Sequence, residues 1–234
     1  MYDKRSANGS NGVYFGLLPV PSDSSEAGML VSYTRWSLDA LGVKNGPSNA
    51  EVIMTPDGPV LLELSLRCHG DDGAWIPLAR SATGGYTQVD ATVDAYLDQK
   101  HFYSLPDTMP KFKCSGQIIA LVSYNRGTVV ATPGFDTIKQ LPSFVYLETV
   151  IKEGSEVNYT TDLFTNIGRV LLLHQDEEVL KKDVNKIRQM EKDNELFEYK
   201  IKDAILKAPS SIFSYSRRAN HRRTISSDRP EMYW

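Results

Sequence analysis

The chain has 234 residues, of which 41% are hydrophobic and 24% are charged, and its formal net charge is −3. This composition is typical of a globular protein with a sizeable apolar core, and the small net charge excludes a global electrostatic attraction to nucleic acid or to anionic membranes. Because no apolar run approaches the roughly 18 residues of a membrane span and the N-terminus lacks the apolar stretch of a signal peptide, we expect a cytoplasmic protein without a membrane partner.

The first quarter of the chain is predicted to form a strand and a helix. Residues 1–12 are polar and rich in Gly, Asn and Ser, which predicts a loop, and residues 13–21 predict a short strand that ends at prolines. The spacing of Asp23 and Glu26 is that of a capping box, which opens an amphipathic helix that ends at Gly42.

A β-hairpin is predicted over residues 51–67, with Pro56-Asp57-Gly58 as its turn. Pairing Thr55 with Pro59 then places Glu51 directly opposite Glu63. Directly opposed residues of an antiparallel pair have Cβ atoms roughly 4.5–5.5 Å apart. The hairpin therefore brings two carboxylates together.

This pair of carboxylates predicts a metal site. Ionised carboxylates at such a distance repel each other, and a hard divalent cation such as Mg²⁺ removes the conflict. Ser65 lies on the same face and adds a hydroxyl or holds a water, and Arg67 offers a planar fork that suits a carboxylate or a phosphate. The alternative is a solvent-facing strand whose charges only meet water. The ordered series Glu51, Glu63, Ser65 and Arg67 on one face favours the site.

Two helical stretches are predicted after the hairpin, the first running toward Gly84-Gly85 and the second over about 86–99. From Lys111 the pattern changes to strands, predicted at QIIALVSY (117–124), TVVA (128–131), SFVYLETVI (143–151) and GRVLLL (168–173).

The C-terminal part is predicted to be helical and then disordered. Residues 176–206 read as one or two helices whose apolar stripe packs on the sheet, with a coiled-coil contact as the alternative. Residues 208–234 have few aliphatic side chains and predict a disordered basic tail. The tail is rich in arginine but has no folded platform of interleaved aromatic residues, so we expect no nucleic-acid partner.

The stretch GPSNAEVIMTPDGPVLLELSLRCHG (46–70) resembles the end of an ATP-grasp domain. There, two acidic residues a dozen positions apart flank a hairpin, and an arginine follows the second acid. Glu51 and Glu63 match the acids, and Arg67 matches the arginine. Within this superfamily the chain is most similar to the carboxylate–amine ligases that make dipeptides from L-amino acids. Further similar segments are YDKR, NGVYFG, LPVPSD, ALGVKNGP and IPLARSATGG.

The resemblance implies an α+β fold, with an ATP-grasp-like antiparallel sheet flanked by helices and a small β-rich C-terminal segment. The sheet is expected to be incomplete on its N-terminal side, because the phosphate-binding lysines and the adenine-binding strand of such enzymes lie upstream of the matching segment. We expect the C-terminal portion of an ATP-grasp domain at 1–108, a β-rich subdomain with a terminal helix at 109–207, and the tail at 208–234.

The resemblance also implies a reaction, namely ATP-dependent amide formation through an acyl phosphate. Glu51 and Glu63, with Ser65, would bind Mg²⁺ (or Mn²⁺) and through it the ATP phosphates. Arg67 would stabilise the acyl phosphate, and His69 would orient the substrate. The expected substrates are small carboxylates and amines, amino acids among them.

The sequence departs from the family pattern at two positions. Ser65 stands where an asparagine usually completes the metal site, and Asn49 stands where the dipeptide ligases often have histidine, which bears on amine or acid specificity. Ser65 and the missing nucleotide-binding half favour an alternative, a non-catalytic binding or regulatory module that keeps the fold. Oligomeric state also stays open, with a homodimer among the possibilities.

Overall fold

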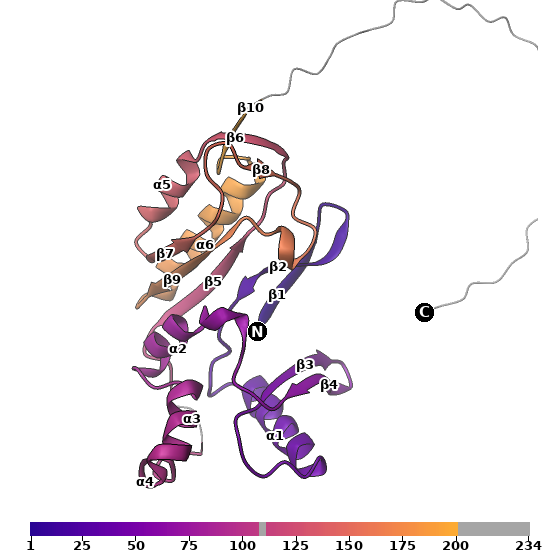
Figure 1. Ribbon diagram of the computed structural model, residues 1–234, viewed down its shortest axis with the longest axis vertical. Coiled ribbons are helices and arrows are strands. Elements are labelled where there is room, and N and C mark those ends of the chain that lie inside the picture. The colour runs from indigo at the N-terminus through magenta and orange to yellow at the C-terminus, as the bar shows by residue number, and fades with distance from the viewer. Residues whose placement is uncertain (108–110, 201–234) are drawn as a thin grey trace, which may run out of the picture. The chain divides into compact units, whose positions relative to one another are not determined.

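The computed structural model describes residues 1–107 and 111–200, which fall in one compact unit, Met1–Lys202 (Figure 1). The tail predicted at 208–234 lies outside the described residues. The strands are β1 (Tyr2–Ala7), β2 (Ser10–Leu17), β3 (Asn49–Thr55), β4 (Gly58–Ser65), β5 (Ser115–Leu121), β6 (Gly127–Ala131), β7 (Phe144–Glu148), β8 (Glu156–Val157), β9 (Gly168–His174) and β10 (Glu198–Lys200). The helices are α1 (Ser25–Ala40), α2 (Ile76–Thr83), α3 (Gln88–Leu97), α4 (Gln99–Phe102), α5 (Pro133–Lys139) and α6 (Glu177–Lys192), with short 3-10 helices η1 (Asp71–Gly73) and η2 (Leu163–Thr165).

The centre of the unit is a five-stranded antiparallel sheet with the order β1-β2-β5-β9-β7. A three-stranded sheet, β10-β6-β8, and the separate β3–β4 hairpin complete the strands of the described residues. The expected α+β fold with an antiparallel sheet flanked by helices is confirmed. Strands from both predicted segments, 1–108 and 109–207, join in the central sheet, and the division at residue 108 stays a prediction.

Helices cover both faces of the central sheet, which explains the continuous apolar runs of its inner strands. Ile118 pairs with Leu171 in the register of β5 and β9, and Leu78 of α2 packs on that face. Their neighbours Ile119 and Val170 point to the other face, into the cluster that α6 completes. Alternate residues of a strand point to opposite faces, so strands buried on both sides need apolar residues at every position. Each fully buried Ile or Leu contributes about 1.5–3 kcal/mol to stability.

The prediction of a loop over residues 1–12 is wrong. Strands β1 and β2 form a hairpin whose turn is Asn8-Gly9, with φ values of 51° and 77°. Two successive positive φ values define the two-residue turn that suits the twist of a hairpin, and Asn-Gly is its preferred sequence. The polar composition concealed this turn signal.

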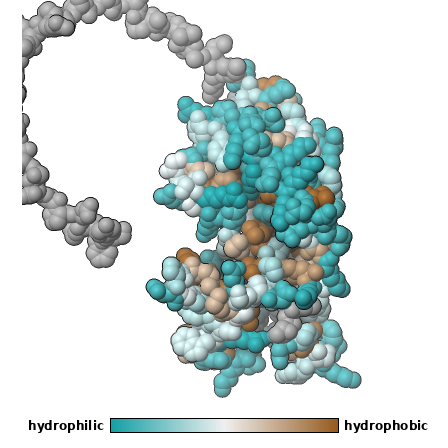
Figure 2. Space-filling view, turned by 180° about the vertical axis from the view of Figure 1, so that it is seen from behind, coloured by the Kyte–Doolittle hydropathy of each residue, from teal (hydrophilic) through white to brown (hydrophobic). Residues whose placement is uncertain are grey.

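The helix predicted after Asp23 is present, with a cap one residue later. Ser24 is the N-cap, and its hydroxyl accepts a hydrogen bond from the amide of Ala27 at 3.1 Å. The expected stop at Gly42 is confirmed by its φ of 71°. The apolar stripe of α1 is not part of the core, because Trp36 is 67% exposed. Figure 2 shows apolar side chains, brown and tan, at the surface among hydrophilic ones.

The helix predicted over 176–206 ends earlier, at Lys192. Asn194 has a φ of 58°, which breaks the helix, and the chain then enters β10, which pairs with β6. The prediction that the stripe packs on the sheet is confirmed for α6, where Leu180 and Ile187 are buried in the main core. Residues 201–206 lie outside the described residues. No helix that the structure describes combines the length and apolar character needed to cross a membrane.

Candidate functional site

The β3–β4 hairpin pairs Glu51 with Glu63 as predicted, although its turn and its register differ from the prediction. At the tip, Thr55 pairs with Gly58, so the turn holds two residues instead of three. The register then shifts by one between Val52 and Glu51, where β4 carries one extra residue. This β-bulge restores the pairing that the predicted turn had implied.

The two glutamates differ in surroundings. Glu51 is half-buried, whereas Glu63 is exposed and its Oε1 accepts a hydrogen bond from the Ser65 hydroxyl at 2.6 Å. Among the described residues, no group of three or more His, Cys, Asp and Glu side chains could hold a metal ion. The predicted Mg²⁺ ligands Glu51, Glu63 and Ser65 offer two carboxylates and one hydroxyl, so phosphates and water would have to supply the other ligands, and this metal site stays a prediction.

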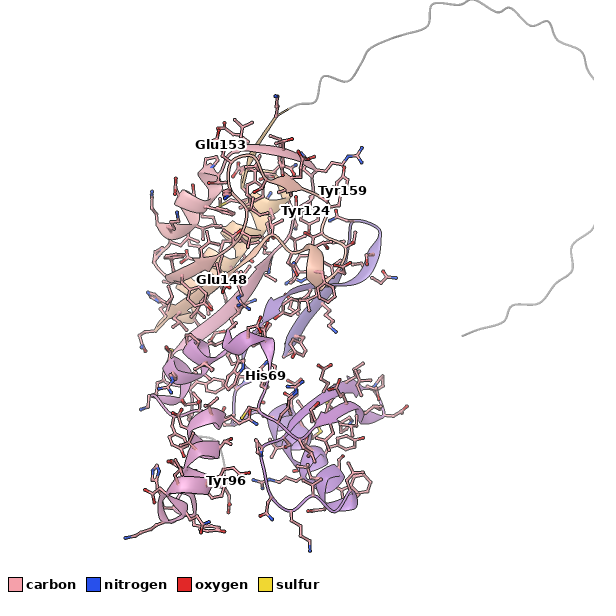
Figure 3. The ribbon with its side chains drawn as sticks, in the orientation of Figure 1. His69, Tyr96, Tyr124, Glu148, Glu153 and Tyr159 are labelled. Atoms are coloured by element: carbon pink, nitrogen blue, oxygen red, sulfur yellow. The ribbon has the colours of Figure 1, made fainter. Side chains whose placement is uncertain are left out.

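The loop that follows β4 turns Arg67 and His69 toward the same region. Arg67 donates from Nη1 to the carbonyl of Cys68 at 2.9 Å and lies over Gly70, where an added Cβ would come within 3.4 Å of Nη1. Its side chain is exposed, so most of its donors remain available. In Figure 3, His69 lies in the loop between the hairpin and α2.

His69 is fixed by contacts on nearly every side. Its Nδ1 lies 3.0 Å from Oδ1 of Asn49, its ring packs edge-on against Trp75, and its amide donates to Oε1 of Gln88. Gln88 also donates to the carbonyl of Ser48, so the first residue of α3 holds both ends of the hairpin. The Oδ1 of Asn49 accepts, which puts the proton on Nδ1 and leaves a lone pair on Nε2.

The Nε2 atom of His69 is buried and has no hydrogen-bond partner among the described residues. Burial lowers the pKa of His69, and Arg67 acts in the same direction, while Asp71 and Glu51 raise it. Because this atom is buried, a ligand N–H or O–H would reach its lone pair only after neighbouring side chains move.

A cavity of about 490 Å³ is lined by residues of the β3–β4 hairpin and the loop after it, of β1 and β2, and of segment 161–163. Three of the five predicted site residues line it, namely Glu51, Arg67 and His69. Glu63 and Ser65 are not among its lining residues. The remaining lining residues are Tyr2, Lys4, Ser10, Asn11, Gly12, Tyr14, Asn49, Gly70, Asp71, Thr161, Asp162 and Leu163.

Sequence reasoning missed Asp71, Tyr2 and Tyr14 as members of this cavity. Burial raises the pKa of all three, and for Tyr2 the carboxylates of Glu51 and Asp71 add to the effect. The phenols thus stay protonated and can donate hydrogen bonds. The tyrosines belong to a hairpin that was predicted in part as a loop, so no sequence pattern placed them near Arg67.

No family model matches this chain. It is 27% identical over 171 residues to dapdiamide A synthase from Enterobacter agglomerans, and this match covers 70% of the chain and 38% of that protein. The chain therefore spans less than half the length of this relative.

Two solved structures share the fold. The L-amino acid ligase from Bacillus licheniformis superposes with a TM-score of 0.62 at 17% identity, covering 85% of this chain and 49% of that one. Phosphoribosylglycinamide synthetase from Anaerococcus prevotii gives a TM-score of 0.58 at 14% identity, with coverages of 80% and 46%. The chain is thus similar in sequence to dapdiamide A synthase and shares its fold with these two enzymes.

Proposed function

We propose that this chain carries the metal-binding and acyl-stabilising part of an ATP-grasp carboxylate–amine ligase. The observation that carries the proposal is the convergence of Glu51, Arg67 and His69 on one cavity, with Glu63 paired across the hairpin from Glu51. The similarity to dapdiamide A synthase and the fold shared with an L-amino acid ligase support the same reaction class.

The proposed reaction has two steps. The substrate carboxylate attacks the γ-phosphorus of ATP, an O–P bond forms, and ADP leaves. The amine then attacks the carbonyl carbon of the acyl phosphate, a C–N bond forms, the C–O bond to phosphate breaks, and the nitrogen gives up its proton. We propose amino acids as the substrate class.

Each side chain has a role that follows from its charge. Glu51 and Glu63, assisted by Ser65, would hold Mg²⁺ or Mn²⁺, which when bound neutralises charge on the phosphoryl oxygens. Arg67 would donate to the acyl-phosphate oxygens, where negative charge builds in both steps. The free Nε2 of His69 would accept a hydrogen bond from the bound substrate and so orient it.

The proposal is tested first by the response of the chain to Mg²⁺. At a Mg²⁺ concentration ten times the Kd, binding adds about 1.4 kcal/mol to the free energy of unfolding, so the melting temperature should rise by about 3 to 5 °C. Glu63→Gln should abolish the rise. Glu153→Gln, which changes an exposed carboxylate far along the chain from the hairpin (Figure 3), should keep it. A wild-type melting curve that Mg²⁺ leaves unchanged would contradict the metal site.

A specific observation favours a second function, the non-catalytic module. The hydroxyl of Ser65 is already bonded to Glu63, and the usual asparagine is absent. Such a module would bind Mg²⁺ and a nucleotide without turnover. Incubation of the chain with ATP, Mg²⁺ and a panel of L-amino acids separates the two functions, because only a ligase releases ADP and phosphate in response to an amino acid.

A further inference from the structure

The loop between Gly70 and Gly73 places a carboxylate inside the candidate site. Asp71 lines the same cavity as Glu51, Arg67 and His69. It also lines a neighbouring cavity of about 260 Å³, so its side chain stands where the two meet. The Asp71 side chain is 32% exposed and so reachable from solvent, and partial burial raises its pKa.

The backbone at this position is unusual. Asp71 has a φ of 61° and Asp72 has a φ of 48°, although neither is glycine. Positive φ values are uncommon for residues other than glycine, and Asp and Asn are among those that tolerate them. Two in succession persist only where the surroundings impose them.

Contacts on both sides of Asp71 impose this conformation. The indole nitrogen of Trp75 donates to the carbonyls of His69 and Gly70 at 3.2 and 2.9 Å, and the amide of Ala74 donates to the Asp71 carbonyl at 2.9 Å. The loop is therefore bonded to the residues that follow it, and it points the Asp71 side chain away from them, into the cavity.

Only one side chain of the described residues pairs with Asp71. The Nη1 of Arg169 lies 3.3 Å from its Oδ1, while the Nε of Arg169 makes a shorter bond of 2.8 Å to Glu148. Charge-assisted N–H···O bonds are usually about 2.7–2.9 Å long, so the contact to Asp71 is loose. The Oδ2 atom of Asp71 accepts no hydrogen bond from the described residues, and it is free for a ligand.

The surroundings of Asp71 suit a cation. Tyr14 and Glu51 line the same cavity, together with the cationic side chains Lys4 and Arg67, and an ammonium group gains from carboxylates and from aromatic faces. Arg67 is the anion-binding group four residues earlier in the same loop. The cavity thus offers one place for a negative acyl phosphate and another for a positive amine.

We propose that Asp71 binds the ammonium group of the amine substrate and so places its nitrogen beside the acyl group that Arg67 holds. This inference rests on the proposed ligase function and names the residue that recognises its second substrate. Asp71 only binds and orients the amine, and no covalent bond is made or broken when it does so.

The test uses ligands that carry an ammonium but no carboxylate, so that they cannot occupy the place of the acid substrate. The probes are the primary amides of alanine, leucine, phenylalanine and lysine, each compared with its Nα-acetylated form, and for lysine with the form acetylated on both nitrogens. Binding to the whole chain is measured by calorimetry with Mg²⁺ and ADP present. We expect at least one amide to bind and acetylation to weaken it at least tenfold.

Two variants localise the binding. Asp71→Asn should weaken the amide at least tenfold, whereas Asp72→Asn, the adjacent residue of the same type and similar φ, should change the Kd less than twofold. Asparagine tolerates the left-handed conformation as aspartate does, so both variants should keep the fold, which their melting temperatures verify. Equal binding by wild type and Asp71→Asn, or binding by none of the amides, would overturn the inference.

The outcome is separable from that of the proposed function. A melting temperature that responds to Mg²⁺ through Glu63, with no amide bound, leaves the ligase proposal standing and removes the role of Asp71. Amide binding that depends on Asp71, with no response to Mg²⁺, leaves an ammonium site and removes the metal site.

Discussion

Burial shapes the chemistry of His69 more than its charged neighbours do. The imidazole has its pKa lowered first by removal from water, with Asp71 opposing that effect and Arg67 adding to it. Its Nε2 is buried and unpaired among the described residues, while its Nδ1 is held by Asn49. A buried polar atom without a partner costs free energy, and such atoms persist mainly where a ligand or water satisfies them.

The lowered pKa of His69 predicts a dependence of stability on pH. Above pH 7.5 the imidazole is neutral in both the folded and the unfolded chain. As the pH falls through about 6.5, the unfolded chain takes up the proton first, so the free energy of unfolding falls. The loss between pH 7.5 and 5.5 should be below about 1 kcal/mol, because the half-buried ring is partly screened by solvent. Urea denaturation should show a shallower pH dependence for His69→Gln, and curves parallel to wild type would contradict the prediction.

Breaking the buried ion pair between Arg188 and Glu191 should cause a large loss of stability. Glu191 is 2% exposed and accepts hydrogen bonds at 2.8 Å from the Val122 amide and from Arg188, which also donates to the carbonyls of Ala120 and Phe15. Glu191→Ala leaves the guanidinium buried without its counter-charge, which should cost about 3–5 kcal/mol of unfolding free energy.

The matched control for this pair replaces both charges by Arg188→Met with Glu191→Leu. Removing both partners avoids the uncompensated charge, so urea denaturation should show the double variant to be more stable than Glu191→Ala. A double variant as unstable as the single one would show that the hydrogen bonds to β2 and β5 matter more than the charge.

At the residue scale, the sequence predicted the pairing of Glu51 with Glu63, although the predicted three-residue turn is a two-residue turn followed by a β-bulge. The roles of Glu51, Glu63, Ser65 and Arg67 stay predictions. Asp71 did not follow from the sequence, because its position depends on a backbone conformation imposed by Trp75 and on Arg169, which lies 98 residues further along the chain. Periodicity carries no information on such a contact.

At the element scale, strands β5, β7 and β9 of the central sheet were predictable because each contains a run of apolar residues. Strand β1 was not, since Tyr2–Ala7 is polar and its partner strand β2 supplies most of the pairing. The end of α6 was also missed, because the apolar spacing of Phe197 continues the helical pattern although that residue packs in the core from outside the helix.

Substitution of two glycines in β2 tests how close this strand must lie to β5. At Gly16, with a φ of 138°, an added Cβ would lie 2.1 Å from the carbonyl oxygen of Ile118. Gly16→Ala should therefore separate the strands and cost about 2–4 kcal/mol. Gly12 also has a positive φ, of 83°, but open space around it, so Gly12→Ala should cost only about 1–2 kcal/mol. Thermal unfolding of both variants measures the difference. Equal losses of stability would show that backbone strain at a positive φ, and not the clash with Ile118, determines the cost.

At the scale of the whole molecule, buried residues are distributed unevenly. The apolar core draws on β2, on α2 and on the elements from β5 to α6, whereas Ser37 is the only buried residue described between residues 18 and 73. The β3–β4 hairpin and α1 even expose large apolar side chains, among them Trp36 and Leu62. The proposed metal ligands Glu51, Glu63 and Ser65 thus lie in the least buried part of the unit.

This distribution predicts local differences in hydrogen exchange. Backbone amides of the hairpin and of α1 are bonded within elements that bury little, so their exchange should be at least about tenfold faster than that of β5 and β9. Hydrogen–deuterium exchange followed by mass spectrometry resolves these segments. Addition of Mg²⁺ should slow exchange in the hairpin and leave β9 unchanged, and uniform protection across the unit would contradict the prediction.

The β-bulge of β4 divides the hairpin into two segments with different pairing registers. The base, where Asn49 pairs with Ser65 and Glu51 with Glu63, keeps its own register, and the tip from Thr55 to Gly58 has another. A tag or a fluorophore grafted between Pro56 and Asp57 would therefore leave the carboxylates in place. A deletion of Leu62, the extra residue of β4, would merge the two registers and still leave Glu63 opposite Glu51. The hairpin is thus an attachment point for labels that report on the site without altering it.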